Sequence, residues 1–145
     1  MHRIALMLLI ALFLICTACA DRGNNQEDAE LAPVLFEESL RIFPDPAELY
    51  EDARFYFGWE DHDGDMTDPT ITVLLINEAG DQIILDAENI EVQGEYAGTL
   101  SFTIRVLDGY QGEYHIVVQD DYGRQSAEIS RFLYVNTEAP IDQIY

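Results

Sequence analysis

The chain has 145 residues, and its 28 aspartates and glutamates outnumber its seven arginines, with no lysine, to give a formal net charge of −21 at pH 7. Because neutralising phosphates requires clustered lysine and arginine, this charge predicts no nucleic-acid partner and makes bare anionic lipid headgroups a poor one. Aromatic residues make up 11% of the chain, which excludes wholesale disorder because enough apolar surface exists to offset the chain entropy of folding.

The N-terminal residues have the parts of a secretory signal. Arg3 precedes an apolar run over residues 4–15, which ends in Cys16-Thr17-Ala18-Cys19. A run of about 12 apolar residues is too short to span a bilayer stably. The segment resembles a bacterial lipoprotein signal peptide, whose pattern is Leu-x-[Gly/Ala]-Cys, with Cys16 where leucine is usual. The resemblance implies that residues 1–18 are removed and that Cys19 becomes the lipidated, palmitate-bearing first residue of the mature protein.

The alternatives for residues 4–15 are a buried helix and an uncleaved anchor. Their position behind a positive charge favours a signal, and the polar, acidic stretch that follows favours a flexible tether over residues 19–32. The resemblance implies a bacterial cell envelope, with the outer membrane favoured in a Gram-negative cell and the outer face of the cytoplasmic membrane otherwise. Both cysteines lie in this leader, so we expect no disulfide within the mature domain.

From residue 33 onward, apolar and polar residues alternate with a period of two, which predicts β-strands. Phe55, Phe57 and Trp59 fall on one face of such a segment, and we expect them in the core. Turns that contain glycine, aspartate or asparagine separate the segments. The expected strands are residues 34–42, 53–59, 70–76, 82–85, 100–106, 113–119 and 126–135.

Only residues 45–52 have a helical signature, with Pro46 at the first position of a single turn and Asp45 as its cap. Many short strands and frequent turns predict an all-β fold in which two antiparallel sheets pack together. We expect one sandwich of about seven strands over residues 33–136. Residues 137–145 are then a C-terminal tail, either disordered or docked on a partner.

Residues 112–124, Gly-Glu-Tyr-His-Ile-Val-Val-Gln-Asp-Asp-Tyr-Gly-Arg, resemble the penultimate strand and following turn of Ig-like domains in bacterial surface proteins. The resemblance implies an Ig-like sandwich of the fibronectin III or cadherin-like kind. It makes Tyr114 the tyrosine-corner residue, whose hydroxyl bonds to nearby backbone, and it places Ile116 where disulfide-bonded Ig domains have their second cysteine. The likeness covers about 80 residues and is nearly silent on function.

Carboxylates occur at alternate positions around Gly64 in residues 59–69, Trp-Glu-Asp-His-Asp-Gly-Asp-Met-Thr-Asp-Pro. Ca²⁺ takes about six to eight oxygen ligands, and a glycine allows the sharp turn that directs successive carboxylates inward. In a sandwich this loop shares one end with the loop that follows residue 119. The alternative is that these residues only form solvated Asx-turns. The candidate Ca²⁺ ligands are Asp61, Asp63, Asp65, Asp68, Asp120 and Asp121.

The candidate chemistry for catalysis is sparse. After cleavage only His62 and His115 remain, with no cysteine beyond Cys19, so neither a Cys-His dyad nor a closed zinc site can be assembled conventionally. We expect His115 on a sheet face and His62 in solvent. Paired carboxylates are uninformative here because acidic residues are so abundant. We therefore expect a protein that is not an enzyme.

Exposed tyrosines offer a different kind of site, because aromatic rings beside carboxylates can stack on sugars and bond their hydroxyls. The candidate ligand-binding residues are Tyr56, Tyr96, Tyr110 and Tyr122.

These observations predict a lipid-anchored cell-envelope protein with a non-catalytic structural, adhesive or interaction role. Its partners would be the bilayer, through the lipid anchor, and an envelope protein or glycan. One alternative is a calcium-assisted carbohydrate-binding or adhesion module. Another is an acidic accessory or inhibitory subunit for a cationic protein, whose binding would weaken with salt as sugar stacking would not.

Overall fold

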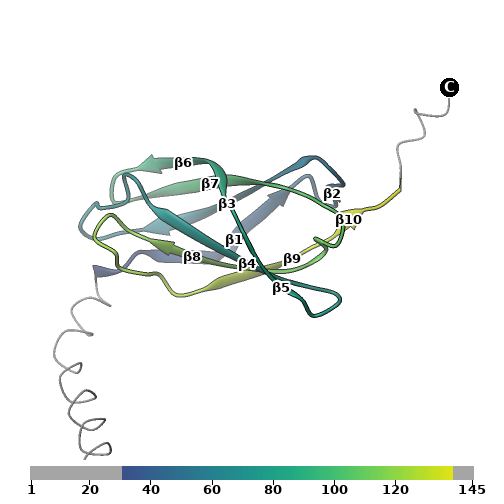
Figure 1. The fold of residues 1–145 in the computed structure, drawn as a ribbon. Coiled ribbons are helices and arrows are strands. Elements are labelled where there is room, and N and C mark those ends of the chain that lie inside the picture. Colours follow the sequence, from purple (N-terminus) through teal and green to yellow (C-terminus); the bar gives the residue numbers. More distant parts are fainter. Residues whose placement is uncertain (1–30, 139–145) are drawn as a thin grey trace, which may run out of the picture. The chain divides into compact units, whose positions relative to one another are not determined.

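The computed structural model describes residues 31–138. The predicted signal peptide, Cys19 and nearly all of the tether and tail therefore lie outside the described residues. Residues 32–138 form one compact unit (Figure 1). Within the described range, no helix is both long enough and apolar enough to cross a membrane.

Two four-stranded antiparallel sheets form this unit, and they lie as two layers in Figure 1. The first sheet has the order β1-β3-β7-β6, and the second has the order β5-β4-β8-β9. The predicted all-β sandwich of antiparallel sheets is confirmed. The strands of the first sheet are β1 (Val34–Phe43), β3 (Asp52–Glu60), β6 (Glu88–Gly94) and β7 (Ala97–Arg105), and those of the second are β4 (Thr70–Asn77), β5 (Gln82–Leu85), β8 (Gly112–Gln119) and β9 (Ile129–Leu133).

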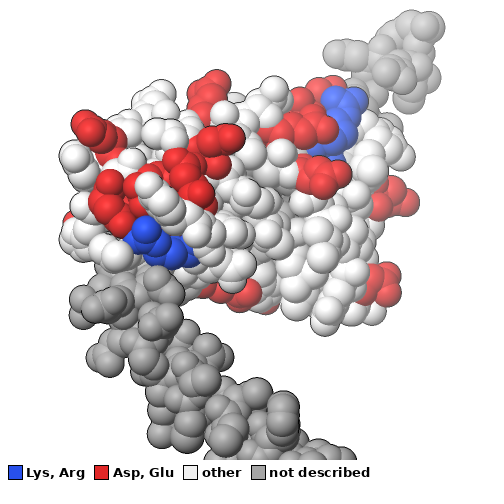
Figure 2. Space-filling model, turned by 60° about the vertical axis from the view of Figure 1, so that its left-hand side comes forward, with Lys and Arg blue, Asp and Glu red and all other residues white. Residues whose placement is uncertain are grey.

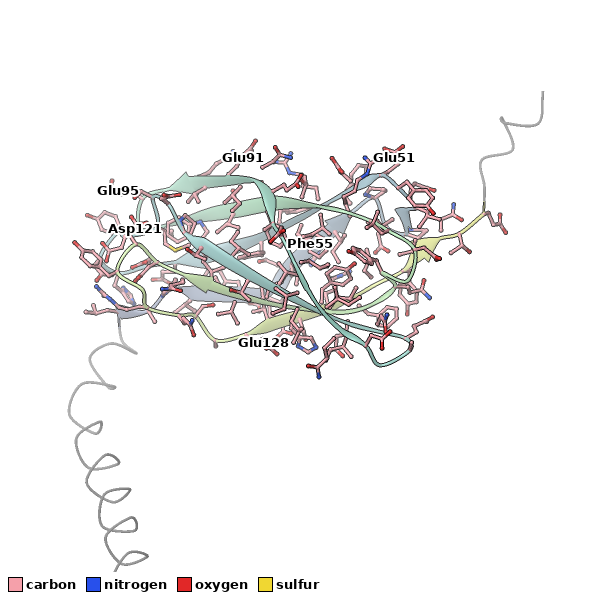
Figure 3. The ribbon with its side chains drawn as sticks, in the orientation of Figure 1. Glu51, Phe55, Glu91, Glu95, Asp121 and Glu128 are labelled. Carbon is pink, nitrogen blue, oxygen red and sulfur yellow. The ribbon has the colours of Figure 1, made fainter. Side chains whose placement is uncertain are left out.

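The core lies between the sheets and is rich in aromatic rings. Phe55, Phe57 and Trp59 are almost completely buried, as predicted, and Figure 3 shows Phe55 inside the sandwich. The ring of Phe55 stacks on that of Phe102 with a centroid distance of 5.0 Å. Burying a large apolar side chain contributes about 1.5–3 kcal/mol, so these rings supply much of the packing energy of a domain whose described residues contain no cysteine.

Tyr114, on β8, ties one end of that strand to the preceding loop. Its side chain is fully buried, and its hydroxyl donates a hydrogen bond to the carbonyl oxygen of Tyr110 at 2.8 Å. Burial also raises the pKa of the phenol. This is the bond to nearby backbone that the resemblance implied, and Ile116 lies fully buried one inward position further along the strand.

The prediction of a single helical turn over residues 45–52 is wrong. Ala47–Glu48 instead form β2, which pairs in parallel with β10 (Val135–Asn136), and the peptide bonds before Pro44 and Pro46 are cis. Proline lacks an N–H donor, and the residue before a proline disfavours the helical region. With two prolines close together, the segment remains extended and finds its hydrogen bonds in β10.

Two strand predictions also differ from the structure. The strand expected over residues 126–135 begins only at Ile129, as β9. The edge strand β6 was not predicted, because its sequence Glu-Asn-Ile-Glu-Val-Gln-Gly has four polar residues and only two apolar ones, and most of its residues are exposed. Pairing with β7 orders β6, and this pairing is a tertiary contact that local alternation does not reveal.

Candidate functional site

The acidic loop lies at one end of the sandwich, where two connections meet. Residues 61–69 join β3 to β4, and residues 120–128 join β8 to β9. The backbone N–H of Asp121 donates to the carbonyl oxygen of Asp65 at 3.0 Å, so the two loops are directly bonded. The prediction that they share one end is confirmed. Figure 3 shows Asp121 at this end, together with Glu95 from the turn between β6 and β7.

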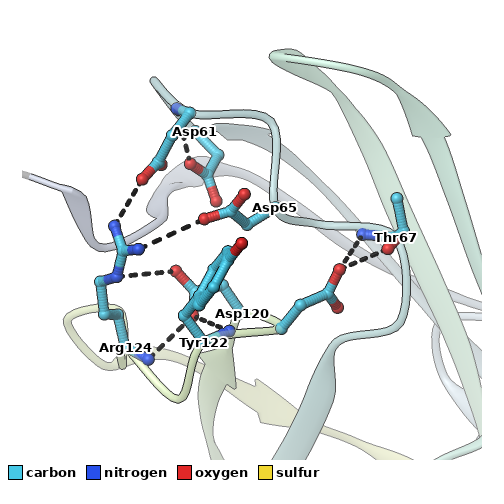
Figure 4. A network of polar contacts seen from close by, with 8 residues as sticks. Asp61, Asp65, Thr67, Asp120, Tyr122 and Arg124 are labelled. Atoms are coloured by element: carbon cyan, nitrogen blue, oxygen red, sulfur yellow. Dashed lines mark hydrogen bonds and ion pairs between the residues drawn. The ribbon is translucent and has the colours of Figure 1, made fainter.

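Arg124 lies among three of the predicted ligands (Figure 4). One terminal nitrogen of its guanidinium forms an ion pair with Asp63, the other lies 3.4 Å from Asp65 Oδ2, and Nε lies 3.7 Å from Asp120 Oδ2. Its side chain is only 16% exposed, so solvent screens these pairs incompletely. We call Asp61, Asp63, Asp65, Asp120 and Arg124 the acidic cluster.

A tight turn places Arg124 in the cluster. Asp120 Oδ1 accepts hydrogen bonds from the backbone N–H groups of Tyr122 at 2.9 Å and Arg124 at 2.8 Å. Gly123 adopts a φ of +86° between them, a conformation that favours glycine. The Asp-Asp-Tyr-Gly-Arg sequence therefore turns the arginine back over the carboxylates.

Asp61 is the most strongly perturbed acid of the cluster. Its carboxylate is fully buried, Oδ1 accepts the backbone N–H of Asp63 at 3.2 Å, and Oδ2 is buried without a hydrogen bond. Burial, followed by the interaction between its carboxylate and that of Asp63, raises the pKa of Asp61 to about 6. Part of the Asp61 population is therefore protonated near neutral pH.

The pKa values of the neighbouring groups shift in the directions expected from this arrangement. The hydrogen bond from Asp61 and then the one from Arg124 lower the pKa of Asp63, whereas burial raises the pKa of Asp65. The hydrogen bond to Asp63 raises the pKa of the Arg124 guanidinium. The cluster is thus one coupled unit in which an arginine supplies the positive charge.

Asp121 points to a different partner. Its carboxylate accepts hydrogen bonds from the hydroxyl of Thr67 and, at 2.9 Å, from the backbone N–H of Asp68. These bonds lower the pKa of Asp121, with the Thr67 hydroxyl as the largest cause. Asp121 therefore holds the two loops together, and Asp68 takes part through its backbone N–H.

The donor set suits Ca²⁺ chemically, since carboxylate oxygens are what this ion prefers. The geometry fits less well, because the side chains of Asp63, Asp65 and Asp120 are directed at a guanidinium. Among residues 31–138, no group of three or more His, Cys, Asp or Glu side chains is arranged to hold a metal ion. Calcium binding by this loop stays a prediction. The predicted ligand set did not include Arg124, although it is the only arginine or lysine in either loop.

The four candidate tyrosines do not gather at one site. Tyr122 is 73% exposed, with the Arg124 guanidinium 5.2 Å from its ring centroid, and Tyr96 is close to Gly64 of the acidic loop. Tyr110 is partly buried against the core at the opposite end of β8. Tyr56 lies on the outer face of the first sheet, in a groove.

This groove has a volume of about 360 Å³ and lies across β3, β7 and β6. Its floor is formed by small residues of β7, Thr99 and Ser101, and the register places Ser101 between Tyr56 on β3 and Glu91 on β6. Figure 3 shows Glu91 on this outer side of the sandwich. The lining consists of Phe43, Arg54, Tyr56, Glu91, Gln93, Thr99 and Ser101.

Polar groups in the groove are already ordered. The Arg54 guanidinium donates to Glu91 Oε2 at 3.0 Å and to Ser101 Oγ at 2.9 Å. Of the lining residues, the sequence pointed only to Tyr56 as a ligand-binding candidate. The others were missed because two of them lie on the unpredicted strand β6, and only the register brings them opposite Thr99 and Ser101.

The histidines lie where the sequence predicted them. His62 is exposed, whereas His115 lies on the outer face of the second sheet, with Nδ1 2.7 Å from Glu128 Oε1.

No protein-family model matches the chain, and no curated protein sequence matches it. One similar solved structure is a DUF4466 family protein from Parabacteroides merdae, with 12% sequence identity and a TM-score of 0.32. The match covers 70% of this chain and 44% of that protein, so this chain corresponds to less than half of that protein's length.

Proposed function

We propose that this protein is a lipid-anchored component of the bacterial cell envelope, with a non-catalytic binding or structural role carried by an Ig-like sandwich. The strand orders support the Ig-like assignment, since β1-β3-β7-β6 corresponds to strands A-B-E-D and β5-β4-β8-β9 to C′-C-F-G. The buried hydroxyl of Tyr114, bonded to Tyr110, supports it as well.

One observation carries the non-catalytic role. In the acidic cluster, the carboxylates of Asp63 and Asp65 form ion pairs with Arg124. The guanidinium of Arg124 stays charged and cannot act as a general base. His115 lies on the outer face of the second sheet, where it is bonded to Glu128, and it is therefore away from the groove on the first sheet. The open surface of the first sheet is better suited to binding than to chemistry.

Lipid anchoring is supported by the sequence Thr17-Ala18-Cys19 behind the apolar run. We expect radiolabelled palmitate to be incorporated when the full chain is expressed in a bacterial host. Cys19→Ser should abolish labelling, and Cys16→Ser is the matched control that should retain it. Labelling that persists in Cys19→Ser would contradict the anchor.

A second candidate role is that of an acidic subunit for a cationic protein. Figure 2 shows acidic side chains gathered over one face of the domain, with few basic ones among them, and the net charge of −21 favours a cationic partner. Binding to a cationic probe such as polyarginine, measured between about 50 and 300 mM NaCl, should then weaken at least tenfold. Binding that is insensitive to salt would argue against this role.

A calcium-assisted binding module is the remaining candidate, supported by the convergence of Asp63, Asp65 and Asp120. Its test is a calcium titration.

A further inference from the structure

We propose that the groove on the outer face of the first sheet is a binding site for a neutral saccharide. This inference names a ligand for the binding role proposed above and rests on that role, but it is independent of the lipid anchor and of calcium. The argument depends on the shape of the groove, its hydrogen-bonding groups, its aromatic rings and its local charge.

The shape is set by the side chains that the register brings together. Ser101 is small and lies between Tyr56 on β3 and Glu91 on β6, whereas Thr99 lies between Gly58 on β3 and Gln93 on β6. The small residues of β3 and β7 leave the sheet surface hollowed between the larger side chains. The volume of about 360 Å³ falls within the range of about 300–1,000 Å³ that is usual for small-molecule sites. The hollow lies on regular strands, which hold its lining more rigidly than a loop would.

The hydrogen-bonding groups suit hydroxyls. The hydroxyls of Thr99 and Ser101 and the amide of Gln93 can each donate and accept, as the hydroxyls of a sugar can. Arg54, which already donates to Glu91 and to Ser101, and Glu91 supply further donors and acceptors beside this floor. Such mixed groups, spread along one surface, match a ligand with many hydroxyls better than an apolar ligand.

Two aromatic side chains border the groove. Phe43 is 69% exposed and Tyr56 is 42% exposed, although other residues of the same strands are buried in the core. In the register Phe43 faces Arg54, two residues from Tyr56, so the rings are diagonal neighbours across β1 and β3. Exposed rings beside polar groups provide the flat apolar surface on which the C–H face of a pyranose stacks.

The local charge selects for a neutral ligand. Arg54 and Glu91 neutralise each other across the groove at 3.0 Å. A cation would be drawn to the acidic cluster instead, and an anion would be repelled by the net charge of −21. A neutral saccharide is neither drawn to the acidic cluster nor repelled by the net charge.

The test is NMR titration of the ¹⁵N-labelled chain from Ala20 to Tyr145, which contains all the described core residues, Leu40 to Leu133. The probes are cellopentaose, xylopentaose, mannopentaose and chitopentaose, each added at millimolar concentration in chelator. We expect at least one pentasaccharide to shift the amide resonances of Thr99, Ser101 and Gln93 in a saturable manner. The affinity should be insensitive to NaCl, because no net charge is neutralised.

Matched variants assign the site. Tyr56→Ala and Gln93→Ala should each weaken binding about tenfold or more, as expected for the loss of a stacking ring or of buried hydrogen bonds. Tyr122→Ala, at the acidic cluster, and Gln82→Ala, on β5, are the controls and should leave the affinity unchanged. Melting temperatures of all four variants establish that the fold is retained.

The outcomes separate this inference from the wider proposal. If no pentasaccharide shifts the groove resonances, the saccharide site is overturned. If binding occurs but Tyr122→Ala abolishes it and Tyr56→Ala does not, the groove is wrong while a binding role survives. Palmitate labelling of Cys19 tests the anchor separately, so a failure of one does not imply a failure of the other.

Discussion

Asp61 combines full burial with a carboxylate oxygen that lacks a hydrogen bond. Such a group is more stable when it carries a proton, because burial penalises the charged form. Arg124 forms ion pairs with the three other aspartates of the acidic cluster, and its single charge compensates theirs only in part. At the scale of single residues, the electrostatic energy at this end of the sandwich therefore depends on pH, through Asp61, and on the charge of Arg124.

The raised pKa of Asp61 makes the stability of the domain depend on pH. Between the ordinary value of 3.8 and about 6, the folded state binds a proton that the unfolded state has released, so stability falls as the pH rises through this range. We expect Asp61→Asn, which stays neutral, to stabilise the protein at pH 7.5 by about 3 kcal/mol and to have little effect at pH 4. Chemical denaturation at both pH values measures this.

The control for that experiment is Asp108→Asn, a substitution in the exposed turn between β7 and β8. This variant should keep the native pH profile. An Asp61→Asn protein that is destabilised equally at pH 4 and pH 7.5 would mean that the carboxylate is needed for packing, and the electrostatic account would then be wrong.

Arg124→Gln tests whether the arginine acts as the internal cation of the acidic cluster. Removing the arginine leaves three neighbouring carboxylates without their compensating charge, and we expect a lower melting temperature in chelator. Millimolar Ca²⁺ should then restore stability more in the variant than in the native protein, because the ion can take the vacated position. Thermal melts in chelator and in calcium measure both effects.

Arg105→Gln provides the comparison, because Arg105 pairs with Asp52 at 3.5 Å in an exposed position and its loss should cost less than about 1 kcal/mol. A saturable rise in the melting temperature of the native protein with Ca²⁺ would support the calcium-assisted module directly. If neither the native protein nor Arg124→Gln responds, the calcium prediction fails.

At the scale of elements, the β6–β7 hairpin controls both the edge of the first sheet and one side of the groove. Gly98 lies at the start of β7, directly opposite Gly94 at the end of β6. A Cβ on Gly98 would lie only 1.7 Å from the carbonyl oxygen of Gln93. The two backbones approach each other more closely than any residue with a side chain allows.

Gly98→Ala should therefore open the hairpin. We expect a destabilisation of about 2 kcal/mol or more, the usual size of a backbone clash that cannot relax, together with faster amide hydrogen exchange in β6. Gly80→Ala is the control, because a Cβ there meets nothing within 4 Å and only the positive φ costs energy, about 1–2 kcal/mol. Unchanged exchange protection in β6 would contradict the role given to Gly98.

At the scale of the whole molecule, charge acts against compactness. The chain has 28 acidic residues and seven arginines, and only a few of the acids in the described domain have a basic partner. Folding brings these acids together, and their mutual repulsion lowers the stability of the compact state. The aromatic core offsets this cost without help from a disulfide within residues 31–138.

Salt should consequently stabilise the protein. The Debye length falls from about 30 Å at 0.01 M to about 3 Å at 1 M ionic strength, so we expect the melting temperature at pH 7 to rise by several degrees over this range of NaCl. At pH 4, where many carboxylates are protonated, the rise should be smaller. A melting temperature that falls with NaCl at pH 7 would mean that attractive ion pairs outweigh the repulsion.

Local alternation in the sequence was enough to predict an all-β sandwich and the core positions Phe55, Phe57 and Trp59. These features follow from side-chain period and polarity, which are properties of neighbouring residues. The meeting of two acidic loops at one end was predicted from the topology of such a sandwich. The hydroxyl bond of Tyr114 was expected from the resemblance of residues 112–124 to Ig-like domains, and the structure contains it. The proposed lipid anchor rests on the sequence alone, since its signal is a short contiguous pattern, and it stays a prediction.

Only the tertiary structure decided which groups the acidic loop faces and where a groove forms. Arg124 reaches Asp63 across 61 residues of sequence, and Glu91 meets Arg54 across 37. Contacts of this range depend on strand register and on the path of each loop, and a one-residue slip in register would place different side chains on the sheet face. The edge strand β6 and the parallel pair β2–β10 likewise exist because a distant segment supplies their hydrogen bonds.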